Sequence, residues 1–267
     1  MRLSLEFLGT GTSVGVPMIG CDCAVCKSTD PRDKRLRSSA IVRAHGADDQ
    51  AETTVLLDTT PDFRYQMLRA NVRHLDAIII THFHADHVMG IDDVRRFNII
   101  QKQVLEIWGT AATLASMRKS FGYVFSDTLR YGWPSLVARE IKIGETFTIG
   151  SLNFHPFELD HEVIINTGLK ISHAKVPDAQ ATAYCLDVKR IDETGYKALQ
   201  GTDTLILDML RENVHPTHMN FSEAMETVNR VNPRRAYFGH IAHEISHAQF
   251  EPRLPAHVRL AYDGLVI

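Results

Sequence analysis

The sequence predicts a single domain of the mixed α/β class that spans residues 1–267. Two features indicate the class: short apolar segments typical of buried strands, and between them segments whose apolar residues recur at helical spacing. A third feature indicates a single domain, because no linker-like stretch rich in proline, glycine and serine divides the chain, and no segment repeats. The chain is long enough to bury a substantial core.

The N-terminal part is expected to form four strands and one helix. A glycine-rich loop at 9–15 follows the first strand, and its backbone N–H groups and hydroxyls can approach an anion closely, which makes Thr12 and Ser13 candidate substrate contacts. A helix is expected to start at Pro61. The apolar side of this helix is formed by Phe63, Met67 and Leu68. The four expected strands are short and apolar: 3–8, 39–42, 53–58 and 77–80.

Strands outnumber helices in the rest of the chain. Helices are expected directly after His87, at 113–121 and at 222–231, the last with Ser222 as its N-cap. The mixture of both element types continues to the C-terminus, which supports the α/β class. The expected strands are 104–108, 147–149, 152–157, 167–171, 183–187, 203–208, 236–239 and 258–262.

The composition argues against several functional classes. Hydrophobic residues make up 44% of the chain and charged residues 23%, which is ordinary for a soluble globular protein. A net charge of −3 argues against a dedicated nucleic-acid binder. No apolar run approaches the ~20 residues that a membrane-spanning helix needs. Residues 1–7 contain no apolar signal-peptide core, so we expect a cytoplasmic protein that does not bind membranes.

A dense group of metal-ligand side chains follows the apolar strand 77–80. Within six positions, the stretch contains His82, His84, Asp86 and His87. Imidazole nitrogens and carboxylate oxygens are ligands that Zn, Mn and Fe accept. The alternative is a polar loop that happens to be rich in histidine, but four such side chains directly after a buried strand favour a metal site. This stretch predicts a metal-dependent hydrolase.

A site with two metals needs further ligands, and strand ends are where a sheet can present them rigidly. His161, Asp187 and His240 each come at or just after the end of an expected strand. Asp187 is the natural bridge, because a carboxylate has two oxygens and can bind two cations. The alternative for each residue alone is a surface or capping side chain. The shared placement at strand ends favours the ligand role.

A second metal site is predicted by the cysteines. Three of the four lie within six positions, at Cys21, Cys23 and Cys26, which is typical of a metal site in a reducing compartment rather than of disulfides. A tetrahedral structural zinc needs four ligands. The fourth is either Cys185 or a histidine. Cys185 lies within an expected strand, where a buried free thiol is common, so a histidine is favoured.

Together these motifs resemble the metallo-β-lactamase superfamily, and within it the PhnP-type cyclic phosphate phosphodiesterases. Residues 82–87 match the HxHxDH signature of the superfamily. Residues 7–12, Phe-Leu-Gly-Thr-Gly-Thr, resemble the opening of the tRNase Z-like and PhnP-like branches. The CxCxxC cluster is similar to the PhnP type and is absent from tRNase Z. Residues 239–243, Gly-His-Ile-Ala-His, resemble the paired histidines of that branch.

The resemblance implies a four-layer αββα sandwich with the active site along one edge of the two sheets. It implies two divalent catalytic metals, Zn or Mn or Fe, and one structural zinc. It also implies that His218 is the catalytic histidine, for which the alternative is a polar residue at a helix N-terminus; Asp86 is counted with it among the catalytic residues. The implied ligands are His82, His84 and His161 for one metal, Asp86, His87 and His240 for the other, Asp187 as the bridge, and Cys21, Cys23, Cys26 and His243 for structural zinc.

Two departures argue against tRNA processing. The sequence has His218-Met219-Asn220 where tRNase Z has an HST-like motif, and it lacks a long basic insertion like the arm that grips tRNA. Arg95 and Arg96 follow the metal motif closely enough that one could contact phosphate. The alternative for both arginines is a solvated helix face.

The expected function is therefore that of a dinuclear metal-dependent phosphodiesterase. Two cations roughly 3.5–4 Å apart would acidify a bridging water to hydroxide, which attacks a small phosphodiester such as a ribose or nucleotide cyclic phosphate. Rivals of the same fold are a tRNA 3′-processing nuclease and a lactonase or thioesterase. A rival of another class is a non-catalytic nucleotide-binding metalloprotein. The expected partner is the small substrate, with no dedicated nucleic acid, and a homodimer is an open expectation.

Overall fold

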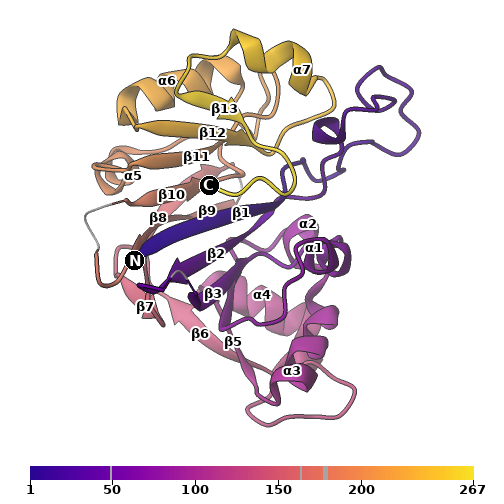
Figure 1. The fold of residues 1–267 in the computed structure, drawn as a ribbon. Helices are drawn as coiled ribbons and strands as arrows, with labels where there is room; N and C mark the ends of the chain where they lie inside the picture. The colour runs from indigo at the N-terminus through magenta and orange to yellow at the C-terminus, as the bar shows by residue number, and fades with distance from the viewer. Residues whose placement is uncertain (49, 163, 177–179) are drawn as a thin grey trace.

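Two β-sheets lie face to face in the computed structural model, and helices cover both outer faces (Figure 1). The structure describes residues 1–48, 50–162, 164–176 and 180–267. This arrangement is the αββα sandwich that the resemblance implied, and the mixed α/β class is confirmed. No helix in the described part of the chain is both long and apolar enough to cross a membrane.

The first sheet follows the order of the sequence. Its first three strands pair antiparallel, and from the third strand onward the pairs are parallel. Parallel strands place all their carboxyl ends at one edge, where the loops that follow can share a site. The six strands are β1 (Arg2–Gly9), β2 (Ser39–His45), β3 (Ala51–Leu57), β4 (Ala77–Ile79), β5 (Leu105–Thr110) and β6 (Leu136–Ile141).

The second sheet combines an antiparallel half with a parallel half. The strand order is β13-β12-β11-β10-β9-β8-β7, and all pairs from β10 to β13 are parallel. The carboxyl ends of β10, β11 and β12 therefore meet at one edge as well. The seven strands are β7 (Phe147–Ile149), β8 (Leu152–His161), β9 (Ile164–His173), β10 (Thr182–Cys185), β11 (Thr204–Asp208), β12 (Arg235–Gly239) and β13 (Val258–Leu260).

Three buried apolar clusters hold the four layers together. The central cluster lies between the sheets and joins residues such as Val55 and Ile79 to Phe154 and Leu169. One outer cluster packs helices on the first sheet and the other packs helices on the second. The helices of the first side are α1 (Phe63–Arg69), α2 (Ala85–Val88), α3 (Arg95–Gln101) and α4 (Ala111–Phe121); those of the second are α5 (Glu193–Ala198), α6 (Phe221–Val231) and α7 (His247–Phe250).

The helix expected after the metal motif is interrupted. Helix α2 ends at Val88, a 3-10 turn spans Ile91–Val94, and α3 begins at Arg95. The break lies at Gly90, where a Cβ would come within 2.0 Å of the Thr60 carbonyl oxygen. The chain passes so close to its neighbour here that only glycine fits.

Other boundaries differ from expectation for local reasons. The N-cap of α6 is Asn220 rather than Ser222, because the Asn220 side chain accepts from the Glu223 N–H while the Glu223 carboxylate accepts from the Asn220 N–H. Leu68, expected on the buried side of α1, is 63% exposed. Strands β8 and β9 are each ten residues long, so His161 ends β8 directly. The sequence did not predict β6, α5 or α7.

Candidate metal centre

The histidine motif lies just beyond the carboxyl end of β4, where the chain turns into α2. His82 and His87 are buried, whereas His84 is half-buried. Their neighbours come from the other sheet: His161 ends β8, Asp187 follows β10, Asp208 ends β11 and His240 follows β12. These side chains therefore gather where the strand ends of both sheets meet, along the edge at which the resemblance placed the active site.

One group of donors contains His82, His84 and His161. A ring nitrogen from each lies within 4.8 Å of the others. His82 Nε2 and His84 Nδ1 are 2.9 Å apart. His161 donates from Nδ1 to the Thr217 carbonyl oxygen at 2.9 Å, which leaves its Nε2 lone pair for another partner. These are the three residues that the resemblance assigned to one metal.

A second group centres on Asp187. Its Oδ2 lies 3.2 Å from His87 Nε2 and 3.2 Å from His240 Nδ1. Asp86 Oδ2 lies 3.3 Å from the same His87 nitrogen. The carboxylate of Asp187 also lies within 4.8 Å of a donor nitrogen of His82. Asp187 thus lies between the two groups, in the place expected of a bridge.

The donor atoms in this region fit bound cations. His87 Nε2, Asp187 Oδ2 and His240 Nε2 are buried, and none of them has a partner with hydrogen-bond geometry among the described residues, although Asp187 Oδ2 lies 3.2 Å from two ring nitrogens. Buried polar atoms are normally satisfied, because leaving one unpaired costs about 1–3 kcal/mol. Divalent cations accept this set of imidazole and carboxylate donors, so they would supply the missing partners.

Burial sets the protonation of the first histidine group. Loss of water contact lowers the pKa of His82 well below its ordinary value and also lowers the pKa values of His84 and His161. Neutral imidazoles result, and a neutral imidazole has the lone pair that a metal needs. Burial acts on His87 in the same direction, but the carboxylates of Asp187 and Asp58 outweigh it and raise the His87 pKa well above the ordinary value.

Asp58 is a member of the site that sequence reasoning missed. It follows β3, is fully buried, and accepts a hydrogen bond from His87 Nδ1 at 2.8 Å. The Thr81 backbone N–H and hydroxyl also donate to this carboxylate, at 2.8 and 2.9 Å. Such a carboxylate fixes the ring orientation of a histidine ligand and increases its basicity. Its position at the end of a buried strand was the signal that could have identified it.

His218 is held in a similar way at the border of the cluster. Its Nδ1 donates to Asp208 Oδ2 at 2.7 Å, and that buried oxygen also accepts from the Val188 N–H at 3.0 Å. The His218 ring stacks on His240, with 4.6 Å between centroids and 16° between planes. One His218 nitrogen lies within 4.8 Å of donors of His161 and Asp187. Sequence reasoning selected His218 but missed Asp208.

Three residues of the site have left-handed backbone conformations. The φ angles are 65° at Asp58, 54° at Asp187 and 55° at His240. Each residue comes within two positions of the end of its strand. Non-glycine residues rarely adopt this conformation, although Asp, Asn and His adopt it more readily than most. Strained backbone at three strand ends of one site is typical of a functional centre.

The cysteine cluster forms a separate donor group beside the sandwich. The Sγ atoms of Cys21, Cys23 and Cys26 lie 3.3, 3.4 and 3.8 Å from His243 Nδ1. Cys185 lies elsewhere, fully buried within β10. All four donor atoms of the group are within 4.8 Å of one another, as ligands of one tetrahedral ion would be. The structure therefore brings a histidine to the three thiols, as the sequence favoured.

Hydrogen bonds make one of these thiols acidic. Hydrogen bonds to the Cys23 sulfur, first from the Cys26 backbone N–H and second from the His243 ring, lower the pKa of Cys23 to about 6. Burial has the opposite effect on Cys26 and raises its pKa to about 11. The loop that presents His243 is held by the buried guanidinium of Arg35, which donates to the Ala242 and Ile245 carbonyl oxygens at 3.1 and 2.7 Å. The His243 donor is thus rigidly placed.

The three candidate substrate contacts lie in different places. The loop with Thr12 and Ser13 adjoins the metal cluster, because Gly11 pairs with Ile241, the residue after His240. Thr12 is buried and Ser13 is exposed. Arg95 lies in α3 and pairs with Asp92 at 2.6 Å. Among the described residues, Arg95 forms no hydrogen bond or salt bridge with the histidine cluster, and α3 packs on the outer face of the first sheet.

The fold and the donor set together define a metal-dependent hydrolase. A model of the beta-lactamase superfamily domain matches residues 53–241, and the chain belongs to this family. The family fold implies divalent metals. A crystal structure of a diphosphatase from the PhnP family is 35% identical, with a TM-score of 0.88 over 100% of this chain and 97% of the other.

Two further relatives are informative. Zinc-bound PqqB from Methylobacterium extorquens is 20% identical, with a TM-score of 0.78 over 99% of both chains, and therefore supports the fold alone. A curated protein from Porphyromonas gingivalis (strain ATCC BAA-308 / W83) named octanoyltransferase is 33% identical over 260 residues, which are 97% of this chain and 50% of that protein. The chain thus spans about half the length of this curated relative.

Proposed function

We propose that the chain is a dinuclear metal-dependent phosphodiesterase that acts on a small phosphodiester, such as a ribose or nucleotide cyclic phosphate. The observation that carries the proposal is the His218–Asp208 pair at the border of the donor cluster. A hydrolase that only needed a nucleophile would require the metals alone. A histidine held by a carboxylate beside them suits a reaction that must also protonate a leaving group.

The catalytic metals, proposed to be Zn, Mn or Fe, are assigned to two donor sets. His82, His84 and His161 would hold one, Asp86, His87 and His240 would hold the other, and Asp187 would contribute to both. Bound cations supply an activated water and neutralise charge on the phosphoryl oxygens.

The protein side chains perform the remaining work. Asp58 fixes the His87 ring, and Ser38 Oγ lies 3.1 Å from His240 Nδ1, which leaves His240 Nε2 free as a donor. Asp208 accepts from His218 Nδ1 and so fixes the ring, which leaves the other His218 nitrogen to pass a proton to the departing alkoxide oxygen. The reaction thereby ends with a phosphate monoester and a neutral alcohol.

The structural zinc is assigned to Cys21, Cys23, Cys26 and His243. It would connect positions more than 200 residues apart, since Cys23 and His243 are separated by 220 residues. Cross-links across long loops stabilise by roughly 2–4 kcal/mol, and metal binding of this kind is coupled to folding.

Cys23→Ser is therefore expected to lose one zinc per chain and to lower Tm by roughly 4–16 °C, at about 2–4 °C per kcal/mol. Calorimetry and elemental analysis measure both effects. Cys185→Ala is the matched control: it removes the fourth cysteine and should keep the full zinc content. A Cys23→Ser protein with unchanged zinc content and unchanged Tm would show that the thiols are not a structural site.

A second candidate function is hydrolysis of an acyl thioester. It is favoured by one observation, the 33% identity to a protein named octanoyltransferase. The same donor cluster could activate water against a thioester carbonyl. A thiolate leaves without protonation, however, so this reaction would not require His218.

A substrate panel distinguishes the candidates. Protein loaded with Zn or Mn is expected to turn over bis-p-nitrophenyl phosphate and at least one nucleotide or ribose cyclic phosphate, and chelation should abolish the activity. The panel should include an organic diphosphate and an octanoyl thioester. His82→Ala, purified identically, controls for contaminating enzymes. Turnover of the thioester with inert phosphate esters would replace the proposal by the second candidate.

A further inference from the structure

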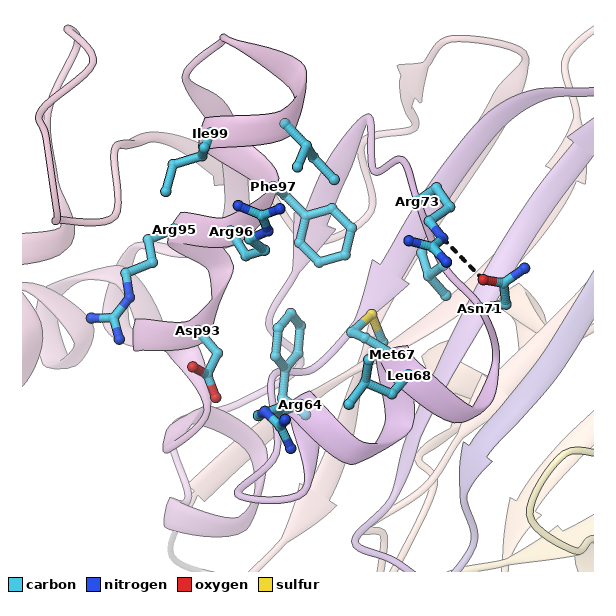
Figure 2. A pocket seen from close by; sticks show the side chains of 13 residues that line it. Arg64, Met67, Leu68, Asn71, Arg73, Asp93, Arg95, Arg96, Phe97 and Ile99 are labelled. Carbon is cyan, nitrogen blue, oxygen red and sulfur yellow. Dashed lines mark hydrogen bonds between the residues drawn. The ribbon is translucent and has the colours of Figure 1, made fainter.

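A groove separate from the metal centre lies between α1 and α3. Its volume is about 420 Å³, which falls within the range of small-molecule sites, roughly 300–1,000 Å³. The floor is apolar: the Phe63 and Phe97 rings pack edge to face with 6.1 Å between centroids, and Met67 lies beside them. Figure 2 shows Phe97 and Met67 facing the hollow between the two helices.

Apolar side chains continue from the floor to the rim. Leu68 of α1 is 63% exposed, and Ile99 and Ile100 of α3 are 53% and 42% exposed. Exposure of three large aliphatic side chains to water around one hollow is unfavourable for the folded chain. Contiguous exposed apolar surface of this kind marks a binding site more often than isolated exposed residues do.

Positive charge surrounds this apolar surface. Four arginines line the groove with a single acidic residue, Asp93, although the chain as a whole has a net charge of −3. Arg95 is paired with Asp92. Arg64 and Arg96 are exposed, and within the described residues neither forms a salt bridge. The lining arginines are Arg64, Arg73, Arg95 and Arg96.

We propose that this groove binds a single-chain amphiphilic anion, a medium-chain carboxylate, with its tail along the exposed aliphatic side chains of Leu68, Ile99 and Ile100 and its head beside the exposed arginines Arg64 and Arg96. The apolar floor disfavours inorganic phosphate. A nucleotide fits poorly, because Phe63 and Phe97 are only 2% and 4% exposed and offer no open ring face for a base. A protein partner would need about 800 Å² on each side, far more than three exposed aliphatic side chains supply.

The test follows decanoate binding to the metal-loaded full chain by titration calorimetry and by ¹³C NMR of the methionine methyl groups. Met67 reports from the floor, and its signal is assigned with Met67→Leu. Decanoate is expected to bind saturably and to shift the Met67 signal. Decanol has the same tail without the charge and butyrate has the charge without the tail, so both should bind at least about tenfold more weakly.

Charge reversal tests the assignment of the head group. Arg64→Glu/Arg96→Glu should weaken decanoate binding about tenfold or more, since each exposed ion pair contributes up to about 1 kcal/mol and reversal adds repulsion. Arg139→Glu, an arginine of β6 outside the groove, should leave the affinity unchanged. Both groove arginines are exposed, so the variant should fold.

Three outcomes would overturn the proposal. The first is no saturable decanoate binding to the wild type, and the second is equal decanoate affinity in the charge-reversed variant. The third is a Met67 shift caused by an acidic amphipathic peptide but not by decanoate, which would assign the groove to a protein partner.

Discussion

Asp187→Asn is expected to lower kcat/KM about 10³-fold, which corresponds to roughly 4 kcal/mol of lost transition-state stabilisation. The reason is position: one Asp187 oxygen lies 3.2 Å from a ring nitrogen of His87 and 3.2 Å from a ring nitrogen of His240. An amide keeps the shape of the carboxylate but not its charge, so it cannot neutralise two cations. Asn is preferred to Ala because φ is 54° here, and Asn tolerates a left-handed backbone that Ala adopts at a cost.

Metal content and activity should be measured on the same samples. Wild-type protein purified without chelator is expected to contain about three metals per chain, and Asp187→Asn fewer. Asp203→Asn is the matched control, since Asp203 precedes β11 at the opposite end from Asp208 and pairs with Arg234. A wild-type stoichiometry near one, or full activity in Asp187→Asn, would contradict a dinuclear mechanism.

His218→Ala is expected to lose about 10²–10⁴-fold in kcat on a substrate with a basic alkoxide leaving group. The loss should be much smaller on a p-nitrophenyl ester, because p-nitrophenolate leaves without a proton. Initial rates on a series of esters of increasing leaving-group pKa measure the difference. His74→Ala, at an exposed histidine paired with Asp76, is the control for loss of an imidazole elsewhere.

The same experiment separates three roles for His218, which lies close to the donors of His161 and Asp187. Loss of metal from His218→Ala would make the residue a ligand. An equal loss on every ester would make it a phosphate-binding residue. Only a loss that grows with leaving-group basicity supports the acid, and this dependence would also argue against a thioester substrate.

Much of the site could be predicted because its residues mark strand ends. Alternation of buried strands and polar turns is visible in sequence, and the carboxyl ends of parallel strands converge in space. His161, Asp187 and His240 were selected on this basis, and the structure brings all three to the histidine motif. The thiol cluster was equally visible, because three cysteines within six positions are rare.

The residues that were missed act through another side chain. Asp58 follows a buried strand and Asp208 ends one, but each contacts a single histidine, His87 or His218, rather than the donor cluster as a whole. The order of residues along the chain does not show which histidine a given carboxylate will contact in the fold. The N-cap of α6 was misplaced because Asn220 and Ser222 are both good caps, and only the Glu223 contact decides between them. Leu68 matched the helical period, but α1 is a single short helix beside an open groove.

The left-handed strand ends limit how the metal preference of this centre could be redesigned. Asp187 and His240 occupy positions with positive φ, which few residue types other than glycine tolerate. A Glu or Cys introduced at either position would have to adopt this left-handed conformation, at a cost of about 1–2 kcal/mol in stability. His84, with φ at −106°, has ordinary extended backbone and is half-buried. Replacement of one metal-donor residue type by another should therefore cost least stability at His84 in the histidine motif. At Asp187 and His240 the backbone restricts which residue types can be introduced.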